Sequence, residues 1–562
     1  MTVGIIAFND FHGNLEPPRQ AVLAPDGSGG TVTVPAGGAA WLAGAIDALR
    51  RRYTHHLTVS AGDLIGGSPV TSALFLDEPT VEVMNRIGLD YSALGNHEFD
   101  RGRAELLRIA HGGCAQFAAR PACALRPYRG ARFTFLAANT LTESGKPLFA
   151  GSALRSFDKG RRKVTIGLIG VTLKETGSLV PRSRNPGLHW VDEAEAANTL
   201  APRLKAAGAD VIVLLIHQGG RTGAASPTAP DPNRCDNLSG AIRPILDRLD
   251  PSIEIVVSGH THWAYVCDYP APGRERPLLL TSAGLYGEQV TELTLTLDTA
   301  THRLLHRRAH NVIVQSPAFS AGGALIANTA LYPAFRPHSG IASLVRRSAA
   351  AASAVAERRV GWLARPVPKM QGPLANTGGA LGRLVADSQL AATRAAGAEI
   401  AFMNPFGLRA ALLTNADGSV SFGQIFAVEP FGNLLVTQTL SGAQIKAILE
   451  QGFDADGPEQ VLTPSAGFVF QYDRARQVGS RIGSMTLNGA PIEPERSYRV
   501  TTSEFLADGG DTFIGFQQGR DSTPGVADVA ALEQWLTATP PRQPPEDVRE
   551  VEFAAAAAPL GN

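Results

Sequence analysis

The segment Gly95-Asn96-His97-Glu98-Phe99-Asp100 follows a short apolar run, residues 91–94, and gathers an amide, an imidazole and carboxylates directly after it. Four other apolar runs along the chain end in the same way, in side chains that can bind a metal ion. These runs and their polar followers are residues 3–8 with Asp10 and His12, 57–61 with Asp63, 211–216 with His217, and 253–258 with His260 and His262. Because sites in open α/β sheets form beyond the carboxyl ends of strands, the five endings predict one shared pocket.

The apolar runs are continuous rather than alternating, which is typical of strands that are covered on both faces. Similar runs occupy residues 133–138, 164–171 and 278–282, and helical patterns occupy 37–51 and 192–207. This succession predicts a layered α/β domain over residues 1–325.

The rest of the chain predicts a linker and a second domain. Residues 326–360 form the expected linker, which contains an Ala- and Arg-rich helix over 343–360. A smaller domain of mixed strands and helices is expected over 361–553. The low-complexity tail, 554–562, is expected to be disordered.

The candidate ligands are carboxylates, imidazoles and one amide, a set that suits Mn, Zn, Co or Fe better than a metal that prefers thiolates. With Asn96 added, the set has seven members, too many for one ordinary transition metal. Two divalent ions about 3.5–4 Å apart would use them all. Asp63 is the natural bridge, since the preceding Gly62 permits a close backbone approach. The identity of the metals stays open.

Two residues of the opening segment are free for chemistry. His97 follows the ligand Asn96 and can reach a substrate phosphoryl group. Asp100 can accept the second ring N–H of His97 and so orient the imidazole. The alternative for Asp100 is a charge at a helix N-terminus.

Composition excludes some classes of protein. Lys and Arg total 51, as do Asp and Glu, so the formal net charge of zero argues against a partner such as a nucleic acid polymer or an acidic membrane surface. No run approaches the ~20 apolar residues of a membrane span. The first eight residues lack the basic region of a leader, so the protein is either cytosolic or has lost its leader.

The four cysteines bear on that choice. None forms a C-x-x-C pair, and an even number in loops fits two disulfides and an oxidising compartment, although four unrelated thiols remain the alternative. Whether Cys114 pairs with Cys123 and Cys235 with Cys267 stays open. We expect a periplasmic or secreted protein whose leader is absent from this sequence.

Three segments of the second domain carry groups that suit a nucleotide. Two phenylalanines on glycine-rich loops can enclose a flat ring, a carboxylate beside Gly-Gly can accept sugar hydroxyls, and a guanidinium can bind phosphate. The residues concerned are Asn404, Arg409, Phe431, Asn433, Phe505 and Asp511. Ordinary core packing is the alternative for the two phenylalanines.

The order of the first-domain motifs resembles the calcineurin-like metallophosphoesterase superfamily. The resemblance implies a four-layer αββα domain in which Asp10, His12 and His262 hold one metal. Asn96, His217 and His260 would hold the other, with Asp63 as the bridge. It also implies catalysis by His97 and Asp100, with in-line attack of a metal-generated hydroxide on phosphorus.

The second domain resembles the C-terminal domain of the 5′-nucleotidases, including the periplasmic UDP-sugar hydrolase type, and is expected to be α+β. In this resemblance Asn404 and Arg409 open and close the phosphate loop, Phe431 and Phe505 stack on the base, Asn433 contacts it, and Asp511 binds the ribose. Phe406 stands where the loop usually has glycine. Gln371 and Ala375 occupy places where bacterial relatives carry arginines, for which Arg365 or Lys369 would be the substitutes.

The resemblance implies hydrolysis of nucleoside 5′-monophosphates, with nucleoside di- and triphosphates, UDP-sugars and 2′,3′-cyclic nucleotides as further substrates. It also implies rotation of one domain against the other. Two alternatives remain at this point: a sulfur-oxidation thiosulfohydrolase of the same fold, and an inactive nucleotide-binding surface protein. The preferred base and the oligomeric state stay open.

Overall fold

The protein is described from a computed structural model that covers residues 1–118, 120–160, 162–223, 231–321, 324–370, 374–454, 459–538 and 541–553. The tail expected to be disordered, 554–562, and Gln371 lie outside the described residues. The chain folds into two compact units. Unit 1 contains Met1–Gly177 and Ser183–Ala351, and unit 2 contains Ser178–Arg182 and the chain from Ala352 onward.

Unit 1 is built on two six-stranded sheets. The first has the order β16 (Leu304–Ile313), β15 (Gln289–Leu297), β1 (Thr2–Phe8), β4 (His55–Ser60), β5 (Tyr91–Ala93) and β6 (Thr134–Leu136). The second has the order β13 (Ala264–Tyr269), β14 (Leu278–Ala283), β12 (Ile253–Ser258), β11 (Val211–Ile216), β9 (Arg162–Val171) and β8 (Ser152–Lys159). Strands β1, β4, β5 and β6 run parallel, as do β9, β11, β12 and β14.

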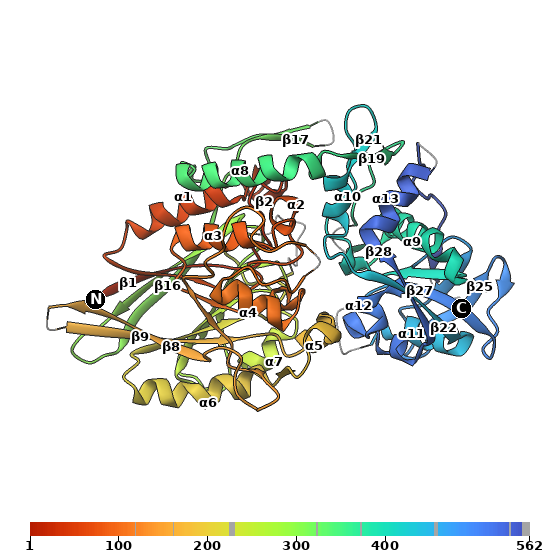
Figure 1. The fold of residues 1–562 in the computed structure, drawn as a ribbon. Coiled ribbons are helices and arrows are strands. Elements are labelled where there is room, and N and C mark those ends of the chain that lie inside the picture. The colour runs from red at the N-terminus through yellow and green to blue at the C-terminus, as the bar shows by residue number, and fades with distance from the viewer. Residues whose placement is uncertain are drawn as a thin grey trace, which may run out of the picture. The chain divides into compact units, whose positions relative to one another are not determined.

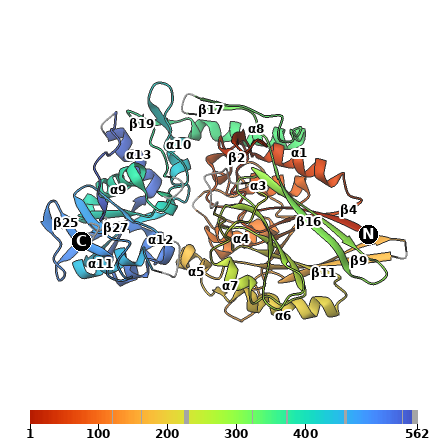
Figure 2. The same cartoon turned by 180° about the vertical axis from the view of Figure 1, so that it is seen from behind.

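The two sheets pack face to face and helices cover their outer faces. Alternate residues of β11 show why its sequence is continuously apolar: Val211, Val213 and Leu215 lie in the core between the sheets. Ile212, Leu214 and Ile216 lie in a second core with α6 (Glu193–Ala206) and α7 (Ile242–Leu246). Helices α1 (Ala39–Arg50) and α3 (Glu78–Ile87) lie on the opposite side of the unit (Figures 1 and 2). The predicted four-layer arrangement is therefore confirmed.

Most predicted elements of unit 1 agree with the structure to within one or two residues at each end, and the helix predicted over 343–360 is present but begins and ends four residues earlier. It runs as α8 (Ser339–Ala356), and β19 (Arg359–Trp362) follows it. The helix begins earlier than predicted because Ile341 and Leu344 are buried and the His338 ring accepts the Ile341 N–H at 3.2 Å. Its end moves because Val360 is buried in the pairing of β19 with β21 (Ser419–Ser421).

Unit 2 is an α+β structure with two larger sheets besides the pair of β19 and β21. The larger has the order β23 (Thr463–Pro464), β20 (Ile400–Met403), β27 (Ser497–Ser503), β22 (Leu434–Ser441) and β28 (Arg520–Ala527). The smaller has the order β26 (Ala490–Pro491), β25 (Ile482–Leu487), β24 (Phe468–Tyr472) and β29 (Glu550–Glu552). The helices are α9 (Gly379–Thr393), α10 (Phe422–Val428), α11 (Gly442–Gln451), α12 (Glu504–Ala507) and α13 (Asp528–Ala538). Among the described residues, no helix is long and apolar enough to cross a bilayer.

Both cysteine pairs are disulfides, Cys114–Cys123 and Cys235–Cys267, which settles the alternative of free thiols. Cys267 is buried in β13, so the second bridge ties a surface loop to the core of unit 1.

Removing the Cys235–Cys267 bridge is expected to destabilise unit 1 more than removing the other. The bridge spans 32 residues against 9 for Cys114–Cys123, and the longer loop loses more entropy on closure. Cys235→Ser with Cys267→Ser should lower the free energy of unfolding by about 3–4 kcal/mol, and the other double variant by about 1 kcal/mol less. Denaturant titration of both variants measures the difference, and equal losses would contradict the loop-length argument.

Candidate functional site

Five strands of unit 1 deliver polar side chains to one edge, because the carboxyl ends of parallel strands meet at the same edge of a sheet. These are β1, β4 and β5 of the first sheet and β11 and β12 of the second. Backbone hydrogen bonds join the first two loops: the Asp10 N–H donates to Gly62 O and the His12 N–H to Asp63 O, both at 3.0 Å. The two loops therefore form one rigid platform.

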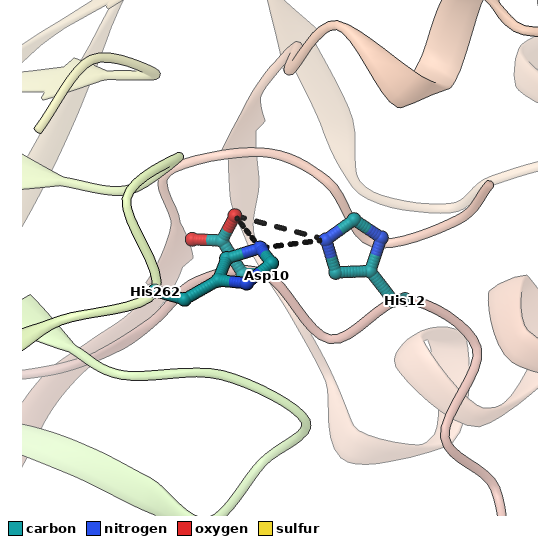
Figure 3. A group of neighbouring side chains, drawn as sticks. All are labelled: Asp10, His12 and His262. Carbon is teal, nitrogen blue, oxygen red and sulfur yellow. Dashed lines mark hydrogen bonds and ion pairs between the residues drawn. The ribbon is translucent and has the colours of Figure 1, made fainter. Parts of the chain in front are cut away.

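Asp10, His12 and His262 form the first cluster of possible metal ligands (Figure 3). The Nε2 atoms of His12 and His262 lie 3.2 Å apart, and Asp10 Oδ1 is 3.4 Å from His262 Nε2 and 3.8 Å from His12 Nε2. Asp10 and His12 are fully buried. Residues some 250 positions apart thus present three donor atoms to one point.

Asp63, His217 and His260 form the second cluster. Asp63 Oδ2 lies 3.0 Å from His217 Nε2, and Asn96 Oδ1 lies 3.2 Å from the same nitrogen. Asp63 Oδ2 is also 3.6 Å from His12 Nε2, so this carboxylate lies between the two clusters. The structure therefore brings together all seven residues that the sequence singles out as metal ligands.

The ring orientations test whether these residues suit metal ions. The Nδ1 atoms of His12 and His217 lie 2.8 Å from the carbonyl oxygens of Gly66 and Ala61, which can only accept. Both rings therefore carry a proton on Nδ1 and direct Nε2 into the cluster, which is the usual arrangement of metal-binding histidines. The donor set and its orientation fit two divalent cations.

The backbone of the site is strained in a consistent way. Asp10, His12, Asp63, His260 and His262 all have positive φ angles, between 46° and 70°. Non-glycine residues adopt this conformation rarely, and such strain concentrates at functional sites. The loops therefore hold these side chains in positions that an unstrained strand end would not give.

The electrostatics of the cluster favour added positive charge. Burial raises the pKa of Asp63, but the charges of His217 and His97 outweigh burial and hold this pKa well below its usual range. Burial lowers the pKa of His217, yet Asp63 reverses the effect and raises it to about 9. Burial and the His217 charge lower the pKa of His260 to about 3. A cation that binds Nε2 of His217 must displace a proton there, so metal affinity should fall with falling pH.

His97 and Asp100 lie beside the metal-ligand clusters and contact each other. The His97 ring nitrogen Nδ1 is 2.9 Å from Asp100 Oδ2, and the His97 ring centre is 5.0 Å from that of His12. The His97 N–H donates to Asp63 Oδ1 at 2.9 Å, which ties this residue to the Asp63 carboxylate. Asp100 is half-buried and orients an imidazole that faces the clusters.

Glu98 is a site residue that sequence reasoning missed. Its buried carboxylate accepts the N–H groups of Gly95, Leu64 and Asp63 at 2.6, 2.7 and 3.0 Å, and that of Ile65 at 3.4 Å. Burial, with the Asp63 charge, raises the pKa of Glu98 to about 8, so cations nearby would help it stay ionised. Its position between His97 and Asp100 in the opening segment was the available signal.

Gly95 has no room for a side chain. An added Cβ would collide with Asp63 Oδ1 and lie 2.6 Å from Asp63 N. Gly95→Ala is therefore expected to displace Asp63, to reduce metal content and to lower kcat about 10²-fold, the scale of a 1 Å misplacement. Metal analysis and steady-state kinetics test this, with Gly223→Ala as the control because a Cβ there meets none of the described residues within 4 Å. Wild-type metal content in Gly95→Ala would contradict the prediction.

Unit 2 brings several of its predicted residues together. Asn404 Nδ2 donates to Asp511 Oδ2 at 2.7 Å, and the Arg409 Cζ lies 5.8 Å from the centre of the Phe431 ring. The Nε and Nη2 atoms of Arg409 are buried and have no hydrogen-bond partner within the described part of the chain. A guanidinium in this state is suited to bind an anion.

The other predicted residues of unit 2 have different surroundings. Asn433 is held through its backbone by Asp528. Phe505 packs partly against the core and lies against Gly510, next to Asp511.

Arg365 and Lys369, the possible substitutes for the absent arginines, have different surroundings. Arg365 forms a 2.9 Å ion pair with Glu546. Lys369 lies near Arg409: burial first, and then the Arg409 charge, lowers its pKa to about 8. Phe406 is half-buried in the turn Pro405–Gly407, and Ala375 is half-buried.

Comparisons with known proteins agree with this architecture. Residues 4–264 match the calcineurin-like phosphoesterase family and residues 364–518 match the 5′-nucleotidase C-terminal domain. The chain is 27% identical over 539 residues to endonuclease YhcR of Bacillus subtilis, covering 95% of this chain but 39% of that protein. It thus spans about two-fifths of the length of that relative.

Two further proteins match along most of their length. The "Probable 5'-nucleotidase" of Treponema pallidum is 26% identical over 571 residues, covering 91% of this chain and 86% of that protein. The crystal structure of a 5′-nucleotidase precursor from Thermus thermophilus superposes with a TM-score of 0.77 at 23% identity, covering 99% of this chain and 100% of that one. The chain therefore belongs to the 5′-nucleotidase family, in which a calcineurin-like phosphoesterase domain is joined to a 5′-nucleotidase C-terminal domain.

Proposed function

We propose that the protein is a dimetal phosphohydrolase that converts nucleoside 5′-monophosphates to nucleoside and phosphate. The observation that carries the proposal is the meeting of seven donor side chains in two clusters, with Asp63 between them. Asp10, His12 and His262 would hold one cation, and Asn96, His217 and His260 the other. When bound, two such cations lower the pKa of coordinated water and neutralise phosphoryl charge.

The chain's own residues supply the remaining steps. Asp63 and Glu98 keep the loops in place, and the Asp63 carboxylate faces both clusters. His97, oriented by Asp100, is placed to donate a hydrogen bond to the phosphoryl group and a proton to the leaving oxygen. No covalent phospho-enzyme is required.

Unit 2 would recognise the nucleotide. Arg409, with two buried N–H-bearing nitrogens that have no partner among the described residues, would bind phosphate. Phe431 and Phe505 would stack on the base, Asn433 would contact it, and Asp511, oriented by Asn404, would accept the ribose hydroxyls. Lys369 beside Arg409 would add a second cation for substrates with more phosphate charge, such as nucleoside di- and triphosphates or UDP-sugars.

We also propose a periplasmic or secreted location. The two disulfides support it, because such bridges persist mainly in oxidising compartments.

A substrate panel tests the proposal. AMP, ATP, UDP-glucose, a 2′,3′-cyclic nucleotide and a thiosulfonate ester would be assayed after chelation and after adding back Mn, Co, Zn or Fe. We expect chelation to abolish hydrolysis and AMP to be turned over. Binding of AMP without turnover would favour an inactive nucleotide-binding protein.

Paired phenylalanine variants separate the proposal from a thiosulfohydrolase of the same fold. Phe431→Ala with Phe505→Ala should raise KM for AMP about 10-fold or more, since each stacked base contributes about 1–3 kcal/mol. Phe117→Ala is the control, because Phe117 is 51% exposed in unit 1. Unchanged kinetics in the double variant, with the thiosulfonate ester as the better substrate, would favour the rival.

A further inference from the structure

Two buried carboxyl groups flank the turn that carries Phe431 and Asn433: one precedes the turn in the chain, and the other is hydrogen-bonded to its end. Glu429 follows α10 and directly precedes Pro430, and Asp528 is the first residue of α13. Asp528 Oδ2 accepts the Asn433 N–H at 3.2 Å, and the Asp528 N–H donates to Asn433 O at 2.9 Å. Asp528 therefore holds the backbone of Asn433 from both sides.

Glu429 lies in surroundings that do not suit a negative charge. It is 1% exposed, and neither carboxyl oxygen has a hydrogen-bond partner among the described residues. Gln389, from α9, interacts with Glu429, and its Oε1 is buried without a partner in the described part of the chain. A buried carboxylate without donor or cation is costly, whereas a protonated carboxyl supplies one O–H donor for an acceptor nearby.

The charged groups around the turn further favour the protonated form of Glu429 over the ionised form. The Asp528 charge on α13 acts on Glu429, Glu504 of α12 accepts the Leu434 N–H at 3.2 Å, and Arg409 lies over Phe431. Burial first, and then the Asp528 charge, raises the pKa of Glu429 well above its usual range, although the Gln389 side chain acts in the opposite direction. Burial raises the pKa of Asp528 to about 7, against the N–H groups of Val529 and Asn433.

We propose that Glu429 and Asp528 are positioning residues that work with one proton, held by Glu429, while ionised Asp528 fixes the Phe431–Asn433 turn in the shape that receives the base. This rests on the proposed function of unit 2. Loss of the proton at alkaline pH places a second charge beside Asp528 and loosens the turn. Protonation of Asp528 at acid pH removes the charged acceptor and has the same effect. Nucleoside affinity is then greatest at intermediate pH.

Isosteric neutral variants distinguish the two acids. Glu429→Gln mimics the protonated acid, so its adenosine Kd at neutral pH should stay within about 2-fold of wild type and should lose the alkaline rise. Asp528→Asn cannot accept with its NH₂ group, so its Kd should rise about 10-fold at neutral pH. If the two acids had only a structural role, both variants would bind adenosine equally weakly, or both would keep the pH profile of the wild type.

Two measurements carry the test, and neither needs catalysis. Calorimetry follows adenosine binding from about pH 6 to about pH 10. Amide hydrogen exchange of a peptide covering 430–436 in the free protein, corrected for intrinsic rates, follows the turn itself. In wild type we expect exchange to accelerate at alkaline pH beyond the correction, and Glu429→Gln to remove this acceleration.

The outcomes are separable from those of the proposed function. If adenosine does not bind, nucleoside recognition by unit 2 fails, while the exchange profile still tests the proton. An alkaline acceleration that persists in Glu429→Gln overturns the inference. If Glu429→Gln does not fold, the exchange profile of the wild-type protein decides. The absence of alkaline acceleration then overturns the inference, and acceleration confined to 430–436 supports it.

Discussion

Asp63→Asn protein is expected to hold fewer than two divalent cations and to lose kcat by on the order of 10³-fold or more. Asp63 Oδ2 lies 3.0 Å from His217 Nε2 and 3.6 Å from His12 Nε2, so this carboxylate lies between the two clusters. An amide keeps the shape of the side chain but removes the charge.

Metal analysis of the purified protein and AMP hydrolysis measure the effect. Asp47→Asn is the matched control, because Asp47 pairs with Arg50 on helix α1 at 39% side-chain exposure. A thermal melt of both variants separates loss of metal from loss of fold. If Asp63→Asn retained two cations and wild-type turnover, the dimetal proposal would be wrong.

His97→Ala is expected to lower kcat about 10²-fold or more while leaving metal content unchanged. His97 is not among the proposed metal ligands, yet its ring lies next to His12 and contacts Asp100. Asp100→Asn should lower kcat about 10-fold, because it removes the group that orients the imidazole. The double variant should be little worse than His97→Ala, since Asp100 acts through His97.

The leaving group gives a sharper readout of the role of His97. An alkoxide leaving group needs a proton, whereas nitrophenolate does not. The loss in His97→Ala should therefore be smaller with p-nitrophenyl phosphate than with AMP. Exposed His306 on β16 provides a control as His306→Ala. Equal losses with both substrates would assign His97 to charge stabilisation rather than proton transfer.

Local patterns in the sequence were sufficient to predict the strands and the donor residues that follow them. The runs ending at Ile216 and Ser258 are apolar at every position but Glu254 and Ser258 because both faces of their sheet are covered, and this pattern is readable without a structure. The ends of the linker helix were predicted four residues too late because they depend on tertiary contacts. Ile341 packs in unit 1, and Val360 pairs in a sheet of unit 2.

The role of Glu98 could not be predicted in the same way. Its four N–H partners come from two separate loops, so the residue appears in the sequence as an ordinary acid within a motif. The same holds for Glu429, whose burial beside the Asp528 charge becomes visible only in the folded chain.

The sequence alone determined which strands exist, where they end and which side chains follow them, because periodicity and residue type are local properties. Only the tertiary structure decided that His12 and His262 lie 3.2 Å apart and that Asp63 lies between two clusters. These distances join segments that are remote along the chain. They are set by the order of strands in two packed sheets and by positive φ angles in the connecting loops. Neither the strand order nor these φ angles can be predicted from the residues of a single segment.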